Sequence, residues 1–505
     1  MKRFTIILFL PVIMMLHSSC NGLMDIEPEN SMTYYNFFKT EQDFEGIMRG
    51  AYETYRSAYE YSTPRAISGE IMDECDQYLT KALRILDATT INSDVTACSW
   101  YSYYQAITQA MMVIENIDKA DLPKERHDYW LGQALFYKAL CYFEIVRDWG
   151  DCPYVATSYK VEPLARKPWN EILDIAISDM KQATTLLDVW NNLTDASGNK
   201  VTTKQIPGKE AAYAMLAHMY AWEGSLLNNN DTLQKAIDVA TWVIEKGGFT
   251  LAADPEEVCT KLLLGKHPES IFELEVVYTD LLWMDVYIDE ELYYQSYPIE
   301  PNSEPGDIAW KDMKIKAESV LKMYKEGDKR RDAYFYKVDS MAHDTLQHIT
   351  GGYAYSWKWR LPRVATSGWQ AGRFINFDQN RIVFRLADII LLRAECRARL
   401  GNNEGAIADL NTIRERADAE LYNSSEYGGD LRYAIFKERE KELLMEGCRW
   451  YDVIRNGYYK TELYGGFRNV SKQDILDGVF FNAVDNNEFS ENPLARQNTY
   501  WLKRM

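Results

Sequence analysis

The sequence predicts an all-α-dominated fold, in which helix pairs form a tetratricopeptide-like scaffold with long irregular loop insertions and little β structure. Two observations support this prediction. Apolar and small residues recur at the i, i+4, i+7 spacing of one helix face in two separate helix-pair patterns. Between these patterns lie stretches whose prolines prevent one continuous helix. Because the repeat periods are irregular, we expect a helical scaffold with insertions and not a uniform solenoid.

The chain begins with an export signal. Two basic residues, Lys2 and Arg3, precede an apolar run over 4–16 that is too short for a lasting membrane span. The run is followed by Ser18-Ser19-Cys20, small residues of the kind that a signal peptidase cleaves beside. The segment resembles the signal of bacterial lipoproteins, which implies removal of 1–19 and acylation of Cys20 as a membrane anchor. The alternative is an ordinary secreted protein in which this cysteine falls by chance.

Length and charge limit the possible classes of protein. Removal of 19 residues leaves 505 − 19 = 486, enough for about two to four domains or one large helical array. The formal charge goes from −19 to −19 − 2 = −21, because the removed segment holds two basic residues and no acid. No long basic stripe is present, so we expect no nucleic-acid partner.

The first helices follow in chain order. Thr40, with Asp43 three residues on, indicates an N-cap that opens a helix through Tyr55. Two further helices, expected over 130–149 and 169–187, form another pair joined through a Gly-Asp-Cys-Pro turn.

Two segments match the tetratricopeptide helix-pair pattern by position. In the first, an A helix ending near Gly224 is followed by a polar loop over 227–235 and a B helix that begins at Ala236. In the second, helices around Ile390 and Leu410 flank a Gly-Asn-Asn break at 401–403.

Two insertions are rich in aromatic residues. Residues 278–310 hold seven aromatics in 33 positions and residues 353–377 hold seven in 25, both above the 13% of the whole chain. Such side chains are favoured where one side is apolar and the other wet, so these loops are candidates for ligand contact. The alternation of Tyr and Trp over 353–359 also fits one strand face packed inward.

Catalytic and metal-binding motifs are not evident. The histidines lack metal-ligand spacing, and neither a nucleophile elbow nor a phosphate-binding loop is present. Paired carboxylates serve glycoside hydrolysis only at a specific separation, which a sequence does not define. We therefore expect that the protein is not an enzyme and has neither a cofactor nor a metal site. A structural calcium ion at residues 485–488 stays an open alternative, although this segment lacks the EF-hand frame.

Seven cysteines follow Cys20 without any C-x-x-C pair, so no zinc ribbon or thioredoxin-like motif is indicated. A Cys141–Cys152 disulfide is conceivable in an exported protein. Most of these cysteines are expected to be small buried apolar residues.

The order and spacing of several motifs along nearly the whole mature chain resemble the SusD/RagB-like outer-membrane nutrient-binding lipoproteins of Bacteroidetes. The most specific segments are Arg385-Leu-Ala-Asp-Ile-Ile-Leu-Leu-Arg-Ala-Glu395 and Glu442-Leu-Leu-Met-Glu-Gly-Cys-Arg-Trp-Tyr-Asp452. We interpret these as structural, since Glu446, Arg449 and Asp452 are spaced to form ion pairs with neighbouring helices. The C-terminal Gln497-Asn-Thr-Tyr departs from the family's usual ending.

The resemblance implies a single domain over 20–505, divided into a helical part (20–270), an aromatic-rich insertion (271–377) and a C-terminal helix pair with a closing segment (378–505). It also implies a lipid-anchored, surface-exposed protein of the outer membrane that binds oligosaccharides and delivers them to a SusC-like TonB-dependent transporter. Two alternatives are a tetratricopeptide-type protein-interaction scaffold and capture of peptides or glycopeptides.

Family members collect ligand on loops before the first helix pair and in the central insertions, which in this chain are residues 73–100, 278–310 and 353–369. We therefore expect five stacking aromatics and two hydroxyl-accepting carboxylates in this chain: Trp100, Trp283, Tyr294, Trp310 and Trp359, with Asp73 and Asp76.

Overall fold

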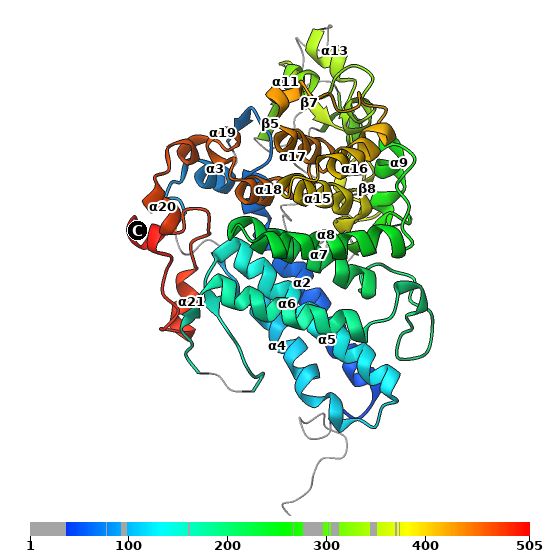
Figure 1. The fold of residues 1–505 in the computed structure, drawn as a ribbon, viewed down its shortest axis with the longest axis vertical. Helices are drawn as coiled ribbons and strands as arrows, with labels where there is room; N and C mark the ends of the chain where they lie inside the picture. The colour runs from blue at the N-terminus through cyan, green and yellow to red at the C-terminus, as the bar shows by residue number, and fades with distance from the viewer. Residues whose placement is uncertain are drawn as a thin grey trace, which may run out of the picture.

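A computed structural model describes residues 37–76, 78–91, 98–159, 162–265, 267–275, 296–300, 302–304, 313–343, 351–368, 371–372 and 374–505. Helices stack from the lower end to the middle of the molecule, and the described strands gather mainly toward the upper end (Figure 1). The prediction of a helix-dominated, tetratricopeptide-like scaffold with little β structure is confirmed.

The N-terminal helices form the lower layers. The first described helix, α2 (Glu41–Ser68), begins where predicted but continues thirteen residues past Tyr55. At its start the Asp43 carboxylate accepts hydrogen bonds from the Thr40 backbone N–H (2.8 Å) and hydroxyl (2.9 Å). Helices α4 (Tyr101–Asn116), α5 (Lys124–Trp149) and α6 (Trp169–Leu186) follow and pack on one another.

The first predicted helix pair consists of α7 (Lys209–Leu226) and α8 (Asn230–Lys246). The predicted loop over 227–235 is wrong for most of its length, because Asn229 caps α8 by accepting from the backbone N–H groups of Asp231 and Thr232. A Cβ atom on Gly224 would lie 2.9 Å from the Leu233 side chain, so a glycine there permits the close approach of the two helices.

The second pair, α15 (Leu386–Arg399) and α16 (Asn403–Arg416), breaks where the sequence indicates. Gly401 adopts a φ of 80°, and the Asn402 side chain then caps α16 through the Gly405 N–H.

The remaining helices are shorter. They are α3 (Tyr78–Ile85), α9 (Pro255–Thr260), α10 (Ser296–Ile299), α11 (Ala317–Met323), α12 (Arg330–Tyr334), α13 (Val338–His343), α17 (Leu431–Glu442), α18 (Arg449–Asn456), α19 (Tyr459–Glu462), α20 (Lys472–Leu476), α21 (Asn486–Glu491) and α22 (Thr499–Leu502). In addition, short 3-10 helices include η7 (Glu426–Gly429) and η8 (Gly465–Asn469).

Within the described residues, the largest sheet has four strands in the order β1-β5-β7-β6, from segments far apart in the chain. They are β1 (Glu74–Cys75), β5 (Met313–Lys316), β7 (Tyr353–Ser356) and β6 (Phe335–Tyr336), all paired antiparallel. Three two-stranded pairs join β2 (Cys152–Pro153) to β3 (Arg166–Lys167), β4 (Ser270–Leu274) to β10 (Arg381–Arg385), and β8 (Pro362–Val364) to β9 (Phe374–Phe377).

All seven cysteines after Cys20 are free thiols, and five of them are buried. The Cys141–Cys152 disulfide is therefore not formed, and both side chains pack in the main core. Across the segments that the structure describes, no helix combines the length and the apolarity that crossing a membrane requires.

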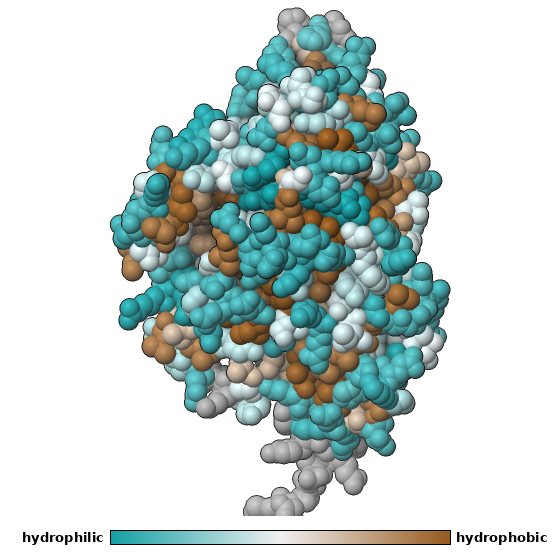
Figure 2. All heavy atoms as spheres, viewed as in Figure 1, coloured by the Kyte–Doolittle hydropathy of each residue, from teal (hydrophilic) through white to brown (hydrophobic). Residues whose placement is uncertain are grey.

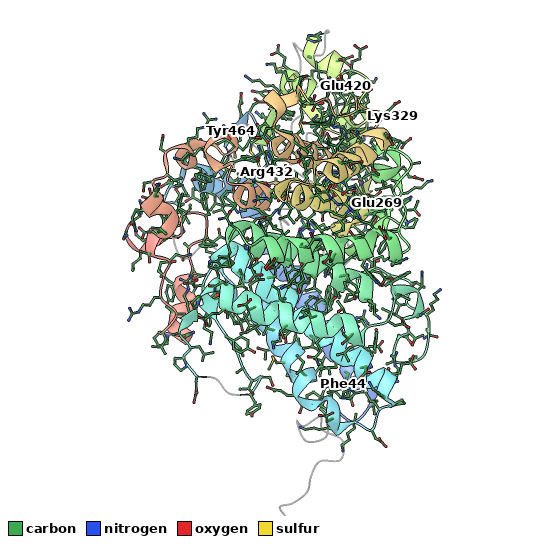
Figure 3. The ribbon with its side chains drawn as sticks, in the orientation of Figure 1. Phe44, Glu269, Lys329, Glu420, Arg432 and Tyr464 are labelled. Carbon is green, nitrogen blue, oxygen red and sulfur yellow. The ribbon has the colours of Figure 1, made fainter. Side chains whose placement is uncertain are left out.

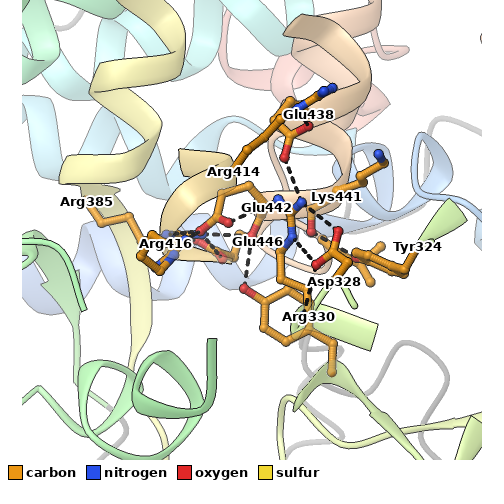
Figure 4. A network of polar contacts seen from close by, with 12 residues as sticks. Tyr324, Asp328, Arg330, Arg385, Arg414, Arg416, Glu438, Lys441, Glu442 and Glu446 are labelled. Carbon is orange, nitrogen blue, oxygen red and sulfur yellow. Dashed lines mark hydrogen bonds and ion pairs between the residues drawn. The ribbon is translucent and has the colours of Figure 1, made fainter. Parts of the chain in front are cut away.

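A network of buried ion pairs joins the C-terminal helices to the strands beside them (Figure 4). Its centre is Arg385, which contacts carboxylate oxygens of Glu269, Glu442 and Glu446 at 2.7–2.9 Å. Arg416 also pairs with Glu442, and Arg330 pairs with Glu438 at 2.7 Å.

The same network explains the family-like motifs. Glu446 pairs with Arg385 and Lys358, Arg449 with Glu440 and Glu462, and Asp452 with Arg439 and Arg455. The prediction that these three motif residues form ion pairs with neighbouring elements is confirmed, although Glu446 precedes α18 and does not lie on it.

Candidate functional site

The four-stranded sheet assembles a polar surface from three distant segments. β1 pairs with β5, and β5 pairs with β7, while α3 follows β1 in the chain. We call this surface the sheet-edge site and define it by Asp73, Glu74, Asp76, Tyr78, Lys81, Lys314 and Tyr353.

Asp73 holds this surface together. Its backbone N–H donates to the Lys314 carbonyl at 2.9 Å, while its carboxylate accepts from the Lys316 N–H (2.6 Å) and the Ser319 hydroxyl (3.0 Å). With both carboxylate oxygens engaged, Asp73 fixes the position of β1 against β5. The predicted role of Asp73 as a hydroxyl acceptor for a ligand stays a prediction.

Glu74 and Tyr353 meet across the sheet. The Tyr353 hydroxyl donates to Glu74 Oε1 at 2.6 Å, and this hydrogen bond raises the pKa of Tyr353 to about 12. Lys314 Nζ lies 5.2 Å from the centre of the same ring. The half-buried ring is thus held in place with a carboxylate at its edge.

Asp76 and Tyr78 are the most open part of the site. Asp76 pairs with Lys81 at 2.6 Å, and their side chains are 65% and 51% exposed. The hydrogen bond from Lys81 lowers the pKa of Asp76, so the carboxylate is ionised at neutral pH. Tyr78, at the start of α3, is 71% exposed. An exposed aromatic face therefore follows an exposed carboxylate closely in the chain.

A second set of aromatics lies along β6 and β7. The Tyr336 ring is 5.8 Å from Tyr297 and 5.2 Å from Trp357, and all three are only half-buried. Lys337 Nζ lies 5.2 Å from the Tyr336 ring, and the Arg360 guanidinium lies 5.1 Å from Trp357. We call these three rings the aromatic row.

Two of the five predicted stacking aromatics are core residues, so the prediction is wrong for them. Trp100 is 3% exposed and packs edge-on against Tyr104 and Trp149. Trp359 is 2% exposed in the core cluster behind the sheet. A buried aromatic ring has more of its apolar surface removed from water than a ring exposed on a loop. The hydrophobic effect therefore favours the inward position of both rings.

The other predicted positions have different outcomes. Trp283, Tyr294, Trp310 and the lipidation residue Cys20 lie outside the described residues. Asp73 and Asp76 lie where expected, on the stretch before the first helix pair. Sequence reasoning missed Tyr78, although it lies inside the indicated stretch, and Tyr336, which lies outside both aromatic-rich stretches.

The described residues contain no group of three or more His, Cys, Asp or Glu side chains arranged to hold a metal ion. The acids of the sheet-edge site are engaged with lysines, a tyrosine and backbone groups instead.

Comparisons with known proteins agree with this architecture. Residues 282–501 match the model of the SusD family, and residues 23–221 match a model described as starch-binding, associating with the outer membrane. A SusD-like protein, P38, of Formosa agariphila is 25% identical over 94% of this chain and 95% of its own length.

Solved structures show the same fold. A SusD homologue from Bacteroides thetaiotaomicron superposes with a TM-score of 0.76 at 21% identity, covering 92% of this chain and 99% of that one. A laminarin-binding SusD-like protein superposes with a TM-score of 0.70 at 20% identity, covering 91% and 99%.

The fold is built on tetratricopeptide-like helix pairs. The two family matches occupy successive parts of the chain, and the whole chain aligns with SusD-like relatives. The chain belongs to the SusD/RagB-like family.

Proposed function

We propose that this protein binds oligosaccharides at the sheet-edge site without catalysis and delivers them to a SusC-like TonB-dependent transporter in the outer membrane. The observation that carries the proposal is that the exposed Tyr78 ring follows the ionised, exposed Asp76 by two positions in the chain. A sugar ring has an apolar C–H face that stacks on tyrosine, and its hydroxyl groups donate to carboxylates. The laminarin-binding relative supports a glycan as the ligand class.

The aromatic row extends the same chemistry. Tyr336 and Trp357 present half-buried rings with a cation close to each. Rings that are held by packing lose little conformational freedom when a ligand binds. A chain of several sugar units would find a further stacking surface in the aromatic row, at the β7–β6 end of the same sheet.

Binding without turnover is supported by the state of the acids. Asp73 is engaged by Lys316 and Ser319 and Asp76 by Lys81, and the residues that define the sheet-edge site include no histidine, cysteine or serine. Delivery by a binding protein requires release of an unchanged ligand.

A flank of the molecule suits a protein partner. Exposed apolar side chains outside the sheet-edge site lie on α3, the start of α4 and the segment from α20 to the C-terminus: Ile85, Tyr101, Leu476, Leu494, Leu502 and Met505. Figure 2 shows brown patches on this flank near the C-terminus. Exposed apolar side chains that gather in one region mark interaction sites in soluble proteins. We assign this flank to the transporter, with Cys20 lipid as the membrane anchor.

A glycan array probed with the purified full-length protein in detergent tests ligand capture. We expect at least one oligosaccharide, with laminarin fragments included, to bind. Tyr78→Ala should weaken that binding by about 1–3 kcal/mol, by analogy with base–aromatic stacking, without a change in melting temperature. Tyr159→Ala is the matched control, because Tyr159 is 74% exposed and lies outside the sheet-edge site.

Equal affinities for wild type and Tyr78→Ala would place the ligand elsewhere. A peptide array that gives binding while every glycan fails would favour the peptide alternative.

Chemical crosslinking in cells tests the partner. We expect a crosslinked species that contains a TonB-dependent transporter, identified by mass spectrometry, and its loss in a Leu476→Asp, Leu502→Asp double variant. Leu227→Asp is the control, since Leu227 is 49% exposed on another part of the surface. Persistence of the species in the double variant would exclude this flank as the interface.

A further inference from the structure

A cavity that shares no residue with the sheet-edge site lies at the end of the C-terminal helix pair. It has a volume of about 220 Å³ and lies between the end of α16, the turn η7, α17 and the loop before α12. This far exceeds the ~10–15 Å³ that one ordered water needs. Glu420, one of its lining residues, lies toward the upper end of the molecule (Figure 3). We call it the α16–α17 cavity.

The cavity contains a half-buried ammonium group without a direct partner. Lys441 Nζ makes no hydrogen bond or ion pair within the described part of the chain, and its ammonium carries no dashed contact in Figure 4. Burial lowers the pKa of Lys441, which the carboxylate of Glu438 opposes from a distance. An ammonium group has three N–H donors, and leaving them unpaired in a partly buried site costs free energy. Such a site therefore favours binding of a ligand that supplies hydrogen-bond acceptors.

The other cations of the cavity are engaged. Arg414 contacts Glu426 at 2.8 Å and Glu438 at 2.7 Å, and Lys325 pairs with Glu420 at 2.6 Å. Among the described residues that line the cavity, Lys441 is therefore the cation whose hydrogen-bond donors remain available.

A strained tyrosine forms part of the wall. Tyr427 has a φ of 48°, in the left-handed region that disfavours a bulky side chain, and it is 44% exposed. Its ring contacts Tyr433 edge-on at 5.0 Å, which fixes its direction. Backbone strain of this kind persists where the surroundings hold it, and it concentrates at ligand sites.

Charge selects the ligand class. Five carboxylates line the cavity against three cations, so a free anion is repelled. The described residues hold no metal-binding group, which disfavours a cation held by several acids. A neutral molecule rich in hydroxyl groups suits both the carboxylates and the ammonium of the cavity, because a hydroxyl group can donate to a carboxylate and accept from an ammonium.

We propose that the α16–α17 cavity binds a single neutral, hydroxyl-rich ring of hexose size, with Lys441 donating to its oxygens and Tyr427 covering its apolar face. This site shares no residue with the sheet-edge site and does not depend on the function proposed above.

Saturation-transfer NMR with D-glucose as the probe tests the inference on the full-length protein in detergent. All proteins in this experiment, the reference included, carry Tyr78→Ala, which weakens binding at the sheet-edge site equally in each of them. We expect glucose to bind, and Lys441→Met to weaken it at least tenfold because the ammonium is lost while the stem is kept. Tyr427→Gly should weaken it similarly without lowering the melting temperature, since glycine relieves the positive φ.

Leu421→Ala is the control, because Leu421 is 46% exposed and does not line the cavity. D-Glucuronate, the charged counterpart, should bind at least tenfold more weakly than glucose. The inference is overturned if glucose does not bind, if glucuronate binds as well or better, or if both cavity variants retain the affinity of the Tyr78→Ala reference.

Discussion

Nη1 of Arg385 lies 2.7 Å from Oε1 of Glu442, and neither side chain is more than 1% exposed. Arg385 is the residue at which β10 ends and α15 begins, and Glu442 is the last residue of α17. This contact therefore ties a strand and two helices of the C-terminal half together. Burying two charges costs free energy that their attraction must offset, so loss of one partner is more costly than loss of a surface pair.

Arg385→Met should lower the free energy of unfolding by about 3–5 kcal/mol, because the carboxylates of Glu269, Glu442 and Glu446 lose their shared cation. Urea denaturation measures the loss. Arg331→Met is the control, since the carboxylates paired with Arg331 are 71% and 58% exposed and the change should stay within about 0.5 kcal/mol. Equal losses in both variants would contradict the structural role of Arg385.

Acid should weaken the fold in a defined pH range. Burial alone would raise the pKa of Glu438, but Arg330 and other cations outweigh it and hold the value at about 2. Because the folded pKa lies below the unfolded value of about 4.3, the stabilisation is complete above pH 4.3 and is lost as pH falls toward 2. Urea midpoints at pH 7, 5 and 3.5 should be similar at the first two and lower at the last. In Glu438→Gln the fall should be shallower; an unchanged fall would show that other carboxylates account for it.

The buried tryptophans separate core from ligand contact. Trp100→Ala and Trp359→Ala should each cost about 3–5 kcal/mol of stability, because both side chains are at most 3% exposed. Thermal melting measures this, with the exposed Tyr159→Ala as a nearly neutral control. If either tryptophan variant keeps its melting temperature and loses glycan affinity, that ring belongs to the binding surface after all.

The lipid anchor has its own test, because Cys20 precedes the described residues. Cys20→Ala should release the protein from the membrane fraction, since the thiol carries the acyl chains that hold it there. Fractionation followed by a high-salt wash measures the distribution, and Cys75→Ala serves as the matched control at a cysteine outside the signal. A Cys20 variant that stays in the washed membranes would disprove the anchor.

The sequence predicted the scaffold well, and the reason is local. Helix caps such as Asn402 and the periodic small residues of α7 and α15 act within a few positions of themselves, so a linear pattern contains them. The start of α8, which the sequence analysis missed, also depends on a local signal. Asn229 is a good N-cap, but it lies within a polar stretch that was interpreted as a loop.

The candidate site was harder to predict because its geometry is not local. Asp73 and Glu74 take their neighbours from residues about 240 to 280 positions away, through pairs that no sequence period encodes. Aromatic enrichment indicated the right stretches but not which ring faces outward: Trp357 is half-buried, whereas Trp359, two residues on, lies in the core.

The strand order β1-β5-β7-β6 has a further consequence for how the protein reaches its active form. Glu74 pairs with Lys314, so β1 and β5 close a loop of 314 − 74 = 240 positions, whereas Lys316 and Tyr353 close one of only 353 − 316 = 37. Closing a long loop costs chain entropy before the contacts that stabilise the closed state have formed. Sheet formation is therefore slower than formation of the local helix pairs. We therefore expect helix formation to precede the sheet, so that ligand binding is the last property a refolding chain regains.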